Sequence, residues 1–452
     1  MALRASFLLQ TFFKYLERVP VSTRMSTRRF VLAPLALSAC IALVACSQPA
    51  ETAVSSSETN TNAEHSSEAR SVAAEVTSPQ ARLVATYDGG TTVLDAETLE
   101  EITDIPLEGF NRLNPLGDQR TVAVSTPEGF RVLDAGAWTQ PHGDHSHSYT
   151  TDPQLTEQVF AGDKPGHVVN NAGRTLLFSD GDGIIQELDN EALTAGSQDT
   201  ELELPDAADE TFELTPHHGV AVALDDGGMV HTEGTEDERS TIVAVDADGE
   251  ETARIDTCPG VHGEAVAGNG AITFGCEDGV VIYQDGEFTK ATAPDDYGRM
   301  GNQAGSEHST VVLADYKVDK DAELERPTRI ALINTEKNTD DAISLVDVDA
   351  SYSFRSLGRG PNGEALVLGT DGNLRIIDPE TAEITKSIPV TESWEEPTQW
   401  QQPRPTLFVQ GEKAFITEPG AHSIHVVDIK SGEVKQSVNV GKEFNEITGV
   451  EG

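Results

Sequence analysis

The chain has 452 residues, of which 76 are acidic and 31 are basic, so its formal net charge is −45. A surface this acidic repels the phosphates of nucleic acids and of anionic membranes, which excludes both as expected partners. Hydrophobic residues make up 37% of the chain and aromatic residues 6%, which is enough for a core built from many thin layers. The acidity also favours the accumulation of cations, without specifying which cation.

The N-terminal segment predicts an export signal. Arg28 and Arg29 precede an apolar stretch over residues 30–45 that is too short to span a bilayer comfortably and ends in small residues. Residues 1–45 are therefore expected to be a signal peptide, and Met25 begins a complete signal by itself. The arginine pair also partly resembles a twin-arginine signal, so the sequence leaves the export route open. A short N-terminal anchor helix is the alternative.

The end of the apolar stretch resembles a bacterial lipobox. Residues 43–46 read Leu-Val-Ala-Cys, so we expect Cys46 to carry a lipid, although the motif that ends at Cys40 fits almost as well. Cleavage before Cys46 would remove six basic residues and one acidic residue, and the exported chain would carry 25 basic and 75 acidic residues. Residues 46–80 are rich in Ser, Thr, Glu and Ala and hold no hydrophobic cluster, which predicts a disordered tether.

From residue 81 to the C-terminus the sequence repeats one pattern. A short β-branched run, a turn with Asp and Gly, and a second apolar run recur, as expected for paired strands. The eight copies lie near residues 84–95, 122–134, 176–185, 222–246, 272–282, 311–334, 366–378 and 414–428.

The spacing of these copies predicts an all-β fold. Residues 81–452 divided by eight give a period of about 46 residues, which is typical of a β-propeller blade with four strands. We expect a single domain over 81–452 with eight blades, and seven as the alternative. Residues 443–450 follow the last copy and could supply the inner strand of the first blade, which would join the two ends of the repeat.

Cys258 and Cys276 are the two cysteines that remain outside the predicted signal peptide and its lipidation site. In a protein exported from the cytoplasm, such an even pair is usually a disulfide. The predicted bond would link the fourth copy to the fifth. Thiolate ligation of a metal is the alternative, and an oxidising compartment disfavours it.

Histidines concentrate between the second and third copies. Residues 141–147 read Pro-His-Gly-Asp-His-Ser-His, which places His142, Asp144, His145 and His147 in one polar loop. Imidazole and carboxylate groups at this spacing can meet on one divalent metal, and zinc accepts such ligands. A solvated loop with incidental metal affinity is the alternative.

A second set of histidines precedes the predicted inner strands of three successive copies. His167 follows Pro-Gly, His217 and His218 follow Thr-Pro, and His262 follows Pro-Gly-Val. In a propeller these positions converge at the rim of the central channel, so His167, His217 and His262 predict a shared zinc site that one carboxylate completes. For each histidine alone, a structural role is the alternative; His308, His422 and His425 carry less weight.

Together with the export signal, the Pro-Gly-His, Pro-His-His-Gly and Val-His-Gly motifs and the His-x-Asp-His segment resemble the extracytoplasmic zinc metallochaperone family AztD. The resemblance covers essentially all of residues 81–452. It implies a β-propeller that binds Zn²⁺ tightly and passes it to the solute-binding protein of a zinc ABC transporter. It also implies that His142, Asp144 and His145 form a mobile accessory metal-binding segment. The chain departs from a plain periplasmic version by its lipobox and tether, which suggest a lipid anchor on the outer face of the cytoplasmic membrane.

Two other classes of function stay open at this stage. A calcium-dependent propeller hydrolase, such as a lactonase, needs oxygen ligands at the channel, and the gathered histidines argue against it. A surface-anchored interaction module explains the repeats and the tether but not the histidines. The sequence has no Gly-x-Ser-x-Gly nucleophile motif and no vicinal cysteine pair, so we do not expect an enzyme.

Overall fold

The computed structural model describes residues 73–207, 212–337 and 339–452. The predicted signal peptide, the alternative start at Met25 and the predicted lipidation site Cys46 lie outside the described residues. No helix among the described residues is long and apolar enough to cross a membrane.

The described chain confirms the predicted all-β repeat and supports eight copies rather than seven. Eight sheets of antiparallel strands follow one another, and each predicted copy supplies paired central strands of one sheet. The first sheet consists of β36 (Glu446–Val450), β2 (Arg82–Tyr87), β3 (Gly90–Asp95) and β4 (Glu101–Pro106), and the second of β5 (Leu113–Pro115), β6 (Thr121–Thr126), β7 (Gly129–Asp134) and β10 (Gln154–Ala161). The third consists of β11 (Pro165–Asn171), β12 (Arg174–Ser179), β13 (Ile184–Asp189) and β14 (Phe212–Glu213), and the fourth of β15 (Ala221–Ala223), β16 (Met229–Gly234), β17 (Arg239–Val245) and β18 (Glu251–Ile255).

The last four sheets have the same strand order. In the fifth of the eight sheets, the short strand β23 (Gly298–Arg299) adds a parallel bridge to β21. The fifth sheet consists of β19 (His262–Val266), β20 (Ile272–Cys276), β21 (Asp278–Gln284) and β22 (Glu287–Thr292), and the sixth of β24 (Gln303–Ala304), β25 (Val311–Asp315), β26 (Arg329–Asn334) and β27 (Ile343–Asp347). The seventh consists of β28 (Leu357–Arg359), β29 (Ala365–Leu368), β30 (Asn373–Ile377) and β31 (Ile384–Pro389), and the eighth of β32 (Leu407–Gln410), β33 (Lys413–Glu418), β34 (Ser423–Asp428) and β35 (Glu433–Asn439).

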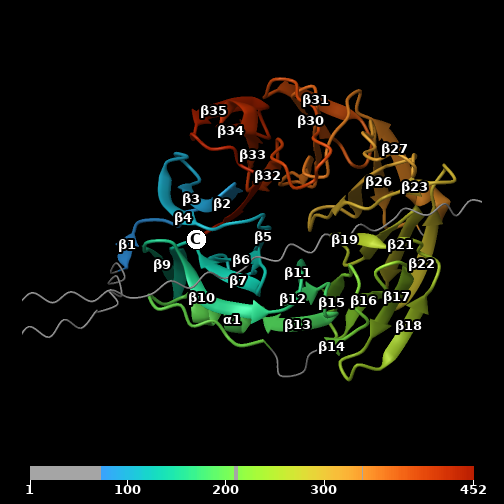
Figure 1. The fold of residues 1–452 in the computed structure, drawn as a ribbon, viewed down its shortest axis with the longest axis horizontal. Helices are drawn as coiled ribbons and strands as arrows, with labels where there is room; N and C mark the ends of the chain where they lie inside the picture. The colour runs from blue at the N-terminus through green and yellow to red at the C-terminus, as the bar shows by residue number, and fades with distance from the viewer. Residues whose placement is uncertain (1–72, 208–211, 338) are drawn as a thin grey trace, which may run out of the picture. The chain divides into compact units, whose positions relative to one another are not determined.

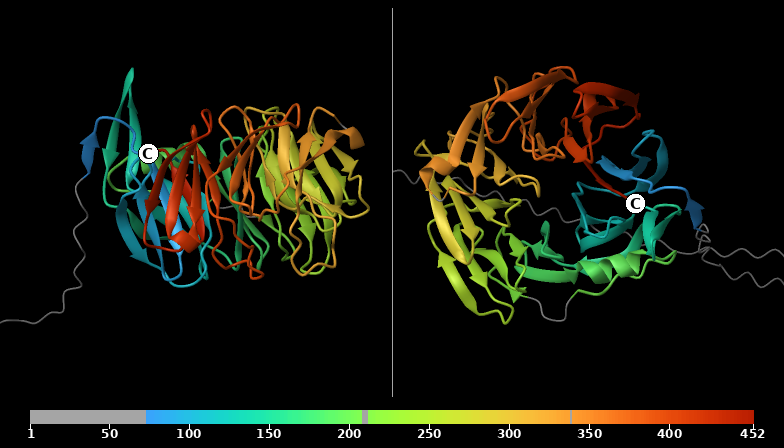
Figure 2. Two further views of the ribbon diagram at one scale, coloured as in Figure 1. Left: turned by 90° about the horizontal axis from the view of Figure 1, so that it is seen from above. Right: turned by 180° about the vertical axis from the view of Figure 1, so that it is seen from behind.

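The sheets are arranged around a common centre (Figure 1). Strands β5, β11, β19 and β32 face that centre, whereas strands such as β18, β22 and β35 lie on the outside (Figure 1). Seen from the side, the sheets stand next to one another as successive blades (Figure 2). The innermost strand of each blade therefore lies at the centre, where segments far apart in the sequence meet.

The C-terminal strand completes the first sheet, as predicted. β36 pairs antiparallel with β2, with Arg82 opposite Val450. Eight hydrophobic clusters of buried residues occupy the spaces between successive sheets, and one of them unites Leu83 of the first sheet with Phe415 of the eighth. Each sheet, the first and the eighth included, thus packs against two neighbours.

This packing explains the sequence pattern of the strands. A central strand such as β6 has sheets on both faces, so all of its residues are buried and it reads as a continuous run of small and β-branched residues. An outer strand such as β4 is covered less, and its residues are mostly exposed. The apolar surface comes from many short strands, which is why few aromatic residues suffice.

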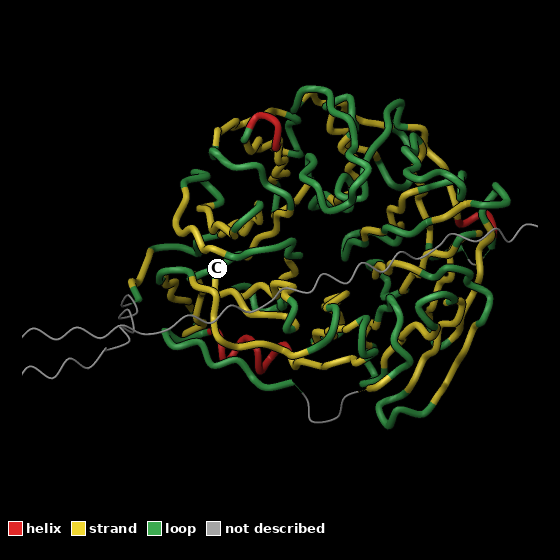
Figure 3. Tube along the Cα trace, viewed as in Figure 1, coloured by secondary structure: helices red, strands yellow, loops and turns green. Residues whose placement is uncertain are grey.

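A β-hairpin and a few helical turns complete the fold (Figure 3). The hairpin consists of β8 (Ala137–His142) and β9 (His145–Thr150), which connect β7 to β10 and form a separate sheet with β1 (Ala74–Val76). The helical elements are α1 (Asn190–Ser197) and the two 3₁₀ turns η1 (Asp340–Ala342) and η2 (Pro419–Ala421). The Asp189 side chain accepts a hydrogen bond from the Ala192 backbone N–H and caps α1.

Two sequence expectations need correction here. The histidine-rich segment is a strand–turn–strand hairpin inserted between β7 and β10 of the second blade, not a loop between the second and third blades. Gly143, at φ +64°, provides its tight turn. The expected tether over residues 46–80 contains β1, so ordered structure begins before residue 81. β1 is ordered because it pairs with the edge of β9. A three-residue segment, Ala-Glu-Val, is too short to predict this contact from the sequence.

Candidate metal centre

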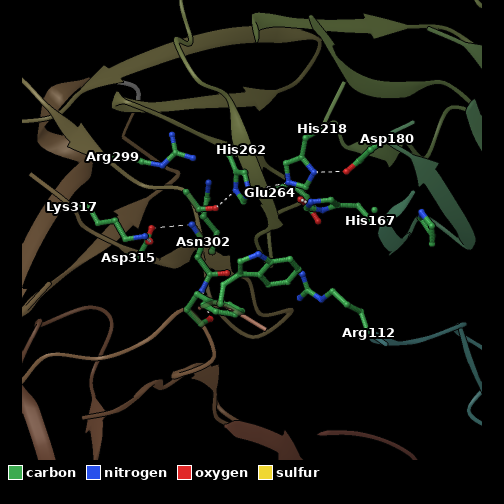
Figure 4. Close-up of a pocket in the computed structure, with 17 residues that line it drawn as sticks. Arg112, His167, Asp180, His218, His262, Glu264, Arg299, Asn302, Asp315 and Lys317 are labelled. Carbon is green, nitrogen blue, oxygen red and sulfur yellow. Dashed lines mark hydrogen bonds and ion pairs between the residues drawn. The ribbon is translucent and has the colours of Figure 1, made fainter. Parts of the chain in front are cut away.

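Three of the predicted histidines meet in a pocket of about 560 Å³ beside the innermost strands of the third to sixth sheets (Figure 4). His167 lies on β11, His218 lies three residues before β15, and His262 is the first residue of β19. Two carboxylates, Asp180 and Glu264, line the same pocket. The neighbouring blades thus place their histidines together, as the sequence predicted from the starts of its repeats.

Local irregularities of the inner strands set the direction of two of these side chains. The pairing register shifts between Pro165 and His167 on β11, and again between His262 and Glu264 on β19. Such bulges re-aim side chains next to binding sites. Gly263, at φ +71°, forms the second irregularity, and a Cβ atom at this position would lie 2.5 Å from the Gly301 carbonyl oxygen. A side chain at this position would therefore displace His262 or its neighbour.

Two of the three imidazole rings are close enough to share one ion. The Nε2 atoms of His218 and His262 lie 3.0 Å apart. The centroid of the His167 ring lies 5.2 Å from that of His218 and 6.2 Å from that of His262. His167 is therefore the outlying member of the three.

Each of the three rings is held by an oxygen atom on its Nδ1 side. His218 Nδ1 lies 2.6 Å from Asp180 Oδ2, His262 Nδ1 lies 2.5 Å from the Gly301 carbonyl, and His167 Nδ1 lies 3.3 Å from Glu264 Oε2. A carbonyl or an ionised carboxylate only accepts hydrogen bonds, so Nδ1 donates and Nε2 keeps its lone pair in each neutral ring. Histidines that bind metals are oriented in this way.

Glycine allows one of these carboxylates to approach. A Cβ atom at Gly166 would lie 2.3 Å from Asp180 Oδ1, so a side chain there would push the carboxylate away from the pocket. Asp180 Oδ1 is buried and has no hydrogen-bond partner among the described residues. The Pro-Gly-His motif thus supplies a ligand candidate through His167 and room for the partner of His218.

Burial and charge move the pKa values of two of the rings in opposite directions. Burial, with the neighbouring His218 and His167, holds the pKa of His262 well below its usual value, so this ring is neutral at neutral pH. Burial also lowers the pKa of His167, but the ion pair with Glu264 outweighs it and leaves the pKa raised. A cation bound in place of the proton on His167 would be stabilised by the negative charge of the same carboxylate, Glu264.

His217, which the sequence placed in this site, does not line the pocket. Its side chain is fully buried, and its ring packs edge-on against Phe178. Nδ1 lies 2.7 Å from the Thr215 carbonyl and Nε2 lies 3.0 Å from the Thr232 hydroxyl, so both nitrogens are used within the core. His218 takes the place expected for His217, because consecutive residues point in different directions.

A second histidine cluster lies on the β8–β9 hairpin. Ligand atoms of His142, His145 and His147 all lie within 4.8 Å of one another. Among the described residues, no other group of three His, Cys, Asp or Glu side chains has its ligand atoms this close together. His145 Nε2 is 3.4 Å from His142 Nδ1 and 3.1 Å from His147 Nε2. Antiparallel pairing places His142 opposite His145, which brings the three rings to one end of the hairpin.

The carboxylate nearest this cluster comes from an unexpected segment. Glu75 on β1 places Oε1 2.6 Å from His147 Nδ1, whereas Asp144 is fully exposed and contacts only the outer nitrogen of His145, at 3.1 Å. Asp144 therefore stands behind the cluster instead of completing it. Glu75 could not be found from sequence because 72 residues separate it from His147.

The remaining predicted groups are accounted for locally. Cys258 and Cys276 form the predicted disulfide between the fourth and fifth blades. His308 is exposed beside Glu307, and His422 contacts Glu443. His425 is mostly buried between Glu418 and Ser437. Among the partners that sequence reasoning missed, Glu264 had a signal in its His-x-Glu spacing from His262, whereas Asp180 was one of many acidic turn residues.

Comparison with known proteins agrees with this description. The zinc chaperone AztD of Citrobacter koseri is 26% identical over 326 residues, which are 70% of this chain and 72% of the relative. The crystal structure of AztD from the same organism superposes with a TM-score of 0.68 at 23% identity and covers 83% of this chain and 99% of the other. The apo form gives 0.67 at 22% identity, over 82% and 98% of the two chains.

A broader comparison shows how far the fold extends. The dihydro-heme d1 dehydrogenase NirN superposes with a TM-score of 0.53 at 12% identity, over 82% of this chain and 74% of NirN, which shows a common fold alone. No protein-family model matches the chain. In sequence and in fold this chain thus resembles the zinc chaperone AztD across most of its length, and the resemblance inferred from the histidine motifs is confirmed.

Proposed function

We propose that this protein is a zinc metallochaperone that holds one Zn²⁺ in the central pocket and passes it to a receiving protein. His218 and His262 are the primary ligands, and His167 joins them as the third. The observation that carries the proposal is the pair of Nε2 atoms 3.0 Å apart, on rings whose Nδ1 atoms each face an acceptor. When both rings are neutral with the proton on Nδ1, both Nε2 atoms offer lone pairs to one cation.

The ligand set favours zinc over calcium. Neutral imidazole nitrogens suit a borderline ion such as Zn²⁺, whereas Ca²⁺ takes oxygen ligands almost exclusively. This chemistry speaks against the calcium-dependent hydrolase that the sequence left open. We further propose that the site transports zinc without catalysing a reaction, in agreement with the relative that is named a zinc chaperone.

The proposed transfer proceeds by ligand exchange. Three neutral histidines leave one position of a tetrahedral zinc ion for an incoming ligand, and the 560 Å³ pocket provides the space. The receiving protein is proposed to be the solute-binding protein of a zinc ABC transporter, as the AztD resemblance implies. The hairpin with His142, His145 and His147 would be an exposed accessory zinc site.

We place this activity outside the cytoplasm, on a protein that is tethered by a lipid on Cys46. The proposal rests on the arginine pair, the apolar stretch and the lipobox-like motif of the sequence. The disulfide between Cys258 and Cys276 fits an oxidising compartment.

Zinc transfer to the receiving protein tests the function. Zinc-loaded protein is mixed with the apo solute-binding protein of the zinc transporter from the same cell envelope, with and without a chelator that captures free zinc. We expect direct transfer that the chelator does not intercept, and its loss in the His218→Ala/His262→Ala variant. His308→Ala, an exposed histidine outside the pocket, is the matched control. Unchanged tight zinc binding in the double variant, or transfer only through free zinc, would overturn the proposal.

A further inference from the structure

The zinc pocket is also lined by cationic side chains. Arg112, Arg299 and Lys317 line the same pocket as the histidines (Figure 4). The whole chain has 31 basic residues against 76 acidic ones, so three cationic side chains in one pocket run against its composition. A cation close to Zn²⁺ raises the energy of the bound ion, so these side chains do not help to hold zinc.

Their own ion pairs are weak. Arg112 contacts Glu446 at 3.3 Å, Lys317 contacts Asp315 at 3.4 Å, and Arg299 contacts Glu277 at 3.7 Å. Each is a single contact at or beyond the outer limit of a hydrogen bond, unlike the bidentate geometry of a strong arginine–carboxylate pair. The side chains of Arg112 and Lys317 are 46% and 32% exposed. The three cations therefore keep donors for a further anion.

The charge balance of the pocket depends on zinc. The three cations face three carboxylates that line the pocket, Asp180, Glu264 and Asp315. Glu446 and Glu277, the partners of Arg112 and Arg299, add two further negative charges. A bound Zn²⁺ makes the pocket more positive than the zinc-free pocket. The pocket is also far larger than one ion requires, since a water molecule occupies roughly 30 Å³ in the liquid.

We propose that the cationic side chains of the pocket, Arg112, Arg299 and Lys317, provide a subsite for a carboxylate ligand that binds when zinc is present. The ligand pairs with the cationic side chains through one carboxylate and offers a carboxylate oxygen to the open position of zinc. This inference rests on the proposed zinc function and adds the chemical class of the group that meets the ion. The carboxylate belongs either to an acidic side chain of the receiving protein or to a small dicarboxylate.

Binding and charge are reciprocally linked in this arrangement. Because zinc adds positive charge to the pocket, it strengthens carboxylate binding, and the carboxylate strengthens zinc binding by the same factor. An acidic group of a receiving protein would enter the loaded pocket in preference to the empty one. The subsite thus lets a receiver distinguish a loaded chaperone from an empty one.

Titrations of the zinc-loaded and the zinc-free protein test this subsite. The probes are succinate, an end-blocked glutamate-rich hexapeptide, and sulfate at equal ionic strength, and zinc content is measured first. Binding is followed by calorimetry and by tryptophan fluorescence, to which Trp400 in the pocket lining contributes. We expect at least one carboxylate probe to bind the zinc-loaded protein about tenfold or more tightly than the zinc-free protein. Succinate binding alone identifies a small carboxylate, and peptide binding alone identifies an acidic segment.

Charge variants distinguish an effect of the pocket on carboxylate binding from an effect of the protein's overall charge. In Arg112→Gln/Arg299→Gln/Lys317→Gln we expect zinc to bind with unchanged stoichiometry and the preference of the carboxylate for the loaded protein to disappear. Arg254→Gln/Lys413→Gln/Lys435→Gln makes the same charge change outside the pocket and should retain that preference.

Four results would overturn the carboxylate subsite. They are equal binding to both forms, no carboxylate binding at all, sulfate binding as tight as carboxylate binding, and a pocket variant that behaves like the control. If zinc binds at the histidines and any of these follows, the subsite is refuted and the zinc function stands. If zinc itself does not bind, the proposed function fails first.

Discussion

His218 and His262 are 44 residues apart in the chain, yet their Nε2 atoms lie 3.0 Å apart in the pocket. The two residues belong to the inner edges of neighbouring blades, so the distance between them is set by the packing of the fourth sheet on the fifth. The Nδ1 atom of each ring is fixed by a different acceptor, Asp180 for His218 and the Gly301 carbonyl for His262. The two rings therefore present a preformed pair of nitrogen ligands.

Alanine substitutions distinguish the role of His218 from that of its sequence neighbour, His217. His218→Ala should lower zinc affinity by more than the roughly 10–100-fold that loss of an outer partner costs, because it removes a ligand itself. His217→Ala should leave the zinc ligands in place and lower the free energy of unfolding by about 1–3 kcal/mol, since Thr232 loses a buried partner. Competition titration with a zinc chelator and chemical denaturation measure the two effects. Equal losses of zinc affinity in both variants would contradict the assignment.

Asp180 should tune the site without binding zinc. Asp180→Asn keeps the size of the side chain but weakens the acceptor for His218 Nδ1, so zinc affinity should fall about 10–100-fold. Asp182→Asn is the control, because Asp182 lies in the same turn and does not line the pocket. Zinc affinities of the two variants, measured at one pH, decide the point. An affinity in Asp180→Asn equal to that of the control would show that this carboxylate plays no part.

The hairpin should account for a second, independent zinc equivalent. His142→Ala/His145→Ala/His147→Ala should lower zinc stoichiometry from two to one without changing the tighter site, because the cluster lies on a separate sheet. Glu75→Gln should weaken only this second equivalent, by about tenfold, through its contact with His147. Calorimetric titration resolves the two classes of site. If Asp144→Asn weakens the second equivalent more than Glu75→Gln does, the geometry of the cluster is wrong.

The disulfide should support the zinc site as well as the fold. Cys258 precedes His262 by four residues, and Cys276 follows Gly275, which lies opposite His262 in the pairing of β19 with β20. The bond closes a separation of 18 residues, and its loss should cost about 3 kcal/mol of unfolding free energy.

Cys258→Ser/Cys276→Ser should therefore unfold at lower denaturant concentration and bind zinc more weakly than the parent protein. Denaturation and chelator competition on the same samples give both values. A loss of stability at unchanged zinc affinity would show that His262 is held by the sheet alone.

Acid stability should depend on Asp371. Burial opposes ionisation of this carboxyl, but hydrogen bonds from Arg375 and Asn373 prevail and lower its pKa from 3.8 to about 2. The carboxylate therefore stabilises the folded state above about pH 4, and this contribution is lost as the pH falls toward 2. The side chain is 36% exposed and screened by water, so the contribution is at most about 1 kcal/mol.

Asp371→Asn should remove that part of the pH dependence. Its unfolding free energy should lie below that of the parent at pH 6 and approach it as the pH falls from 4 toward 2. Denaturation curves at several pH values measure the difference between the two proteins. A constant difference over the whole range would exclude the proposed contribution of this ion pair.

The sequence alone determined the repeat and the residue types of the site. Short β-branched runs with Asp-Gly turns at a regular period can bury their apolar faces only by stacking as sheets, so the architecture and its eight copies followed from local pattern. The positions of His167 and His262 at the starts of copies placed them at the centre for the same reason. Two cysteines near neighbouring copies sufficed for the disulfide.

Only the tertiary structure decided which groups face one another. His217 and His218 are adjacent in sequence, and the direction of each ring depends on the turn before β15, which leaves His217 in the core and His218 in the pocket. Asp180 and Glu75 reach their histidines from 38 and 72 residues away, and in so acidic a chain no local pattern singles them out. Local preferences encode strands and turns, whereas ligand geometry is fixed by contacts between blades, and such contacts exist only once the blades have packed.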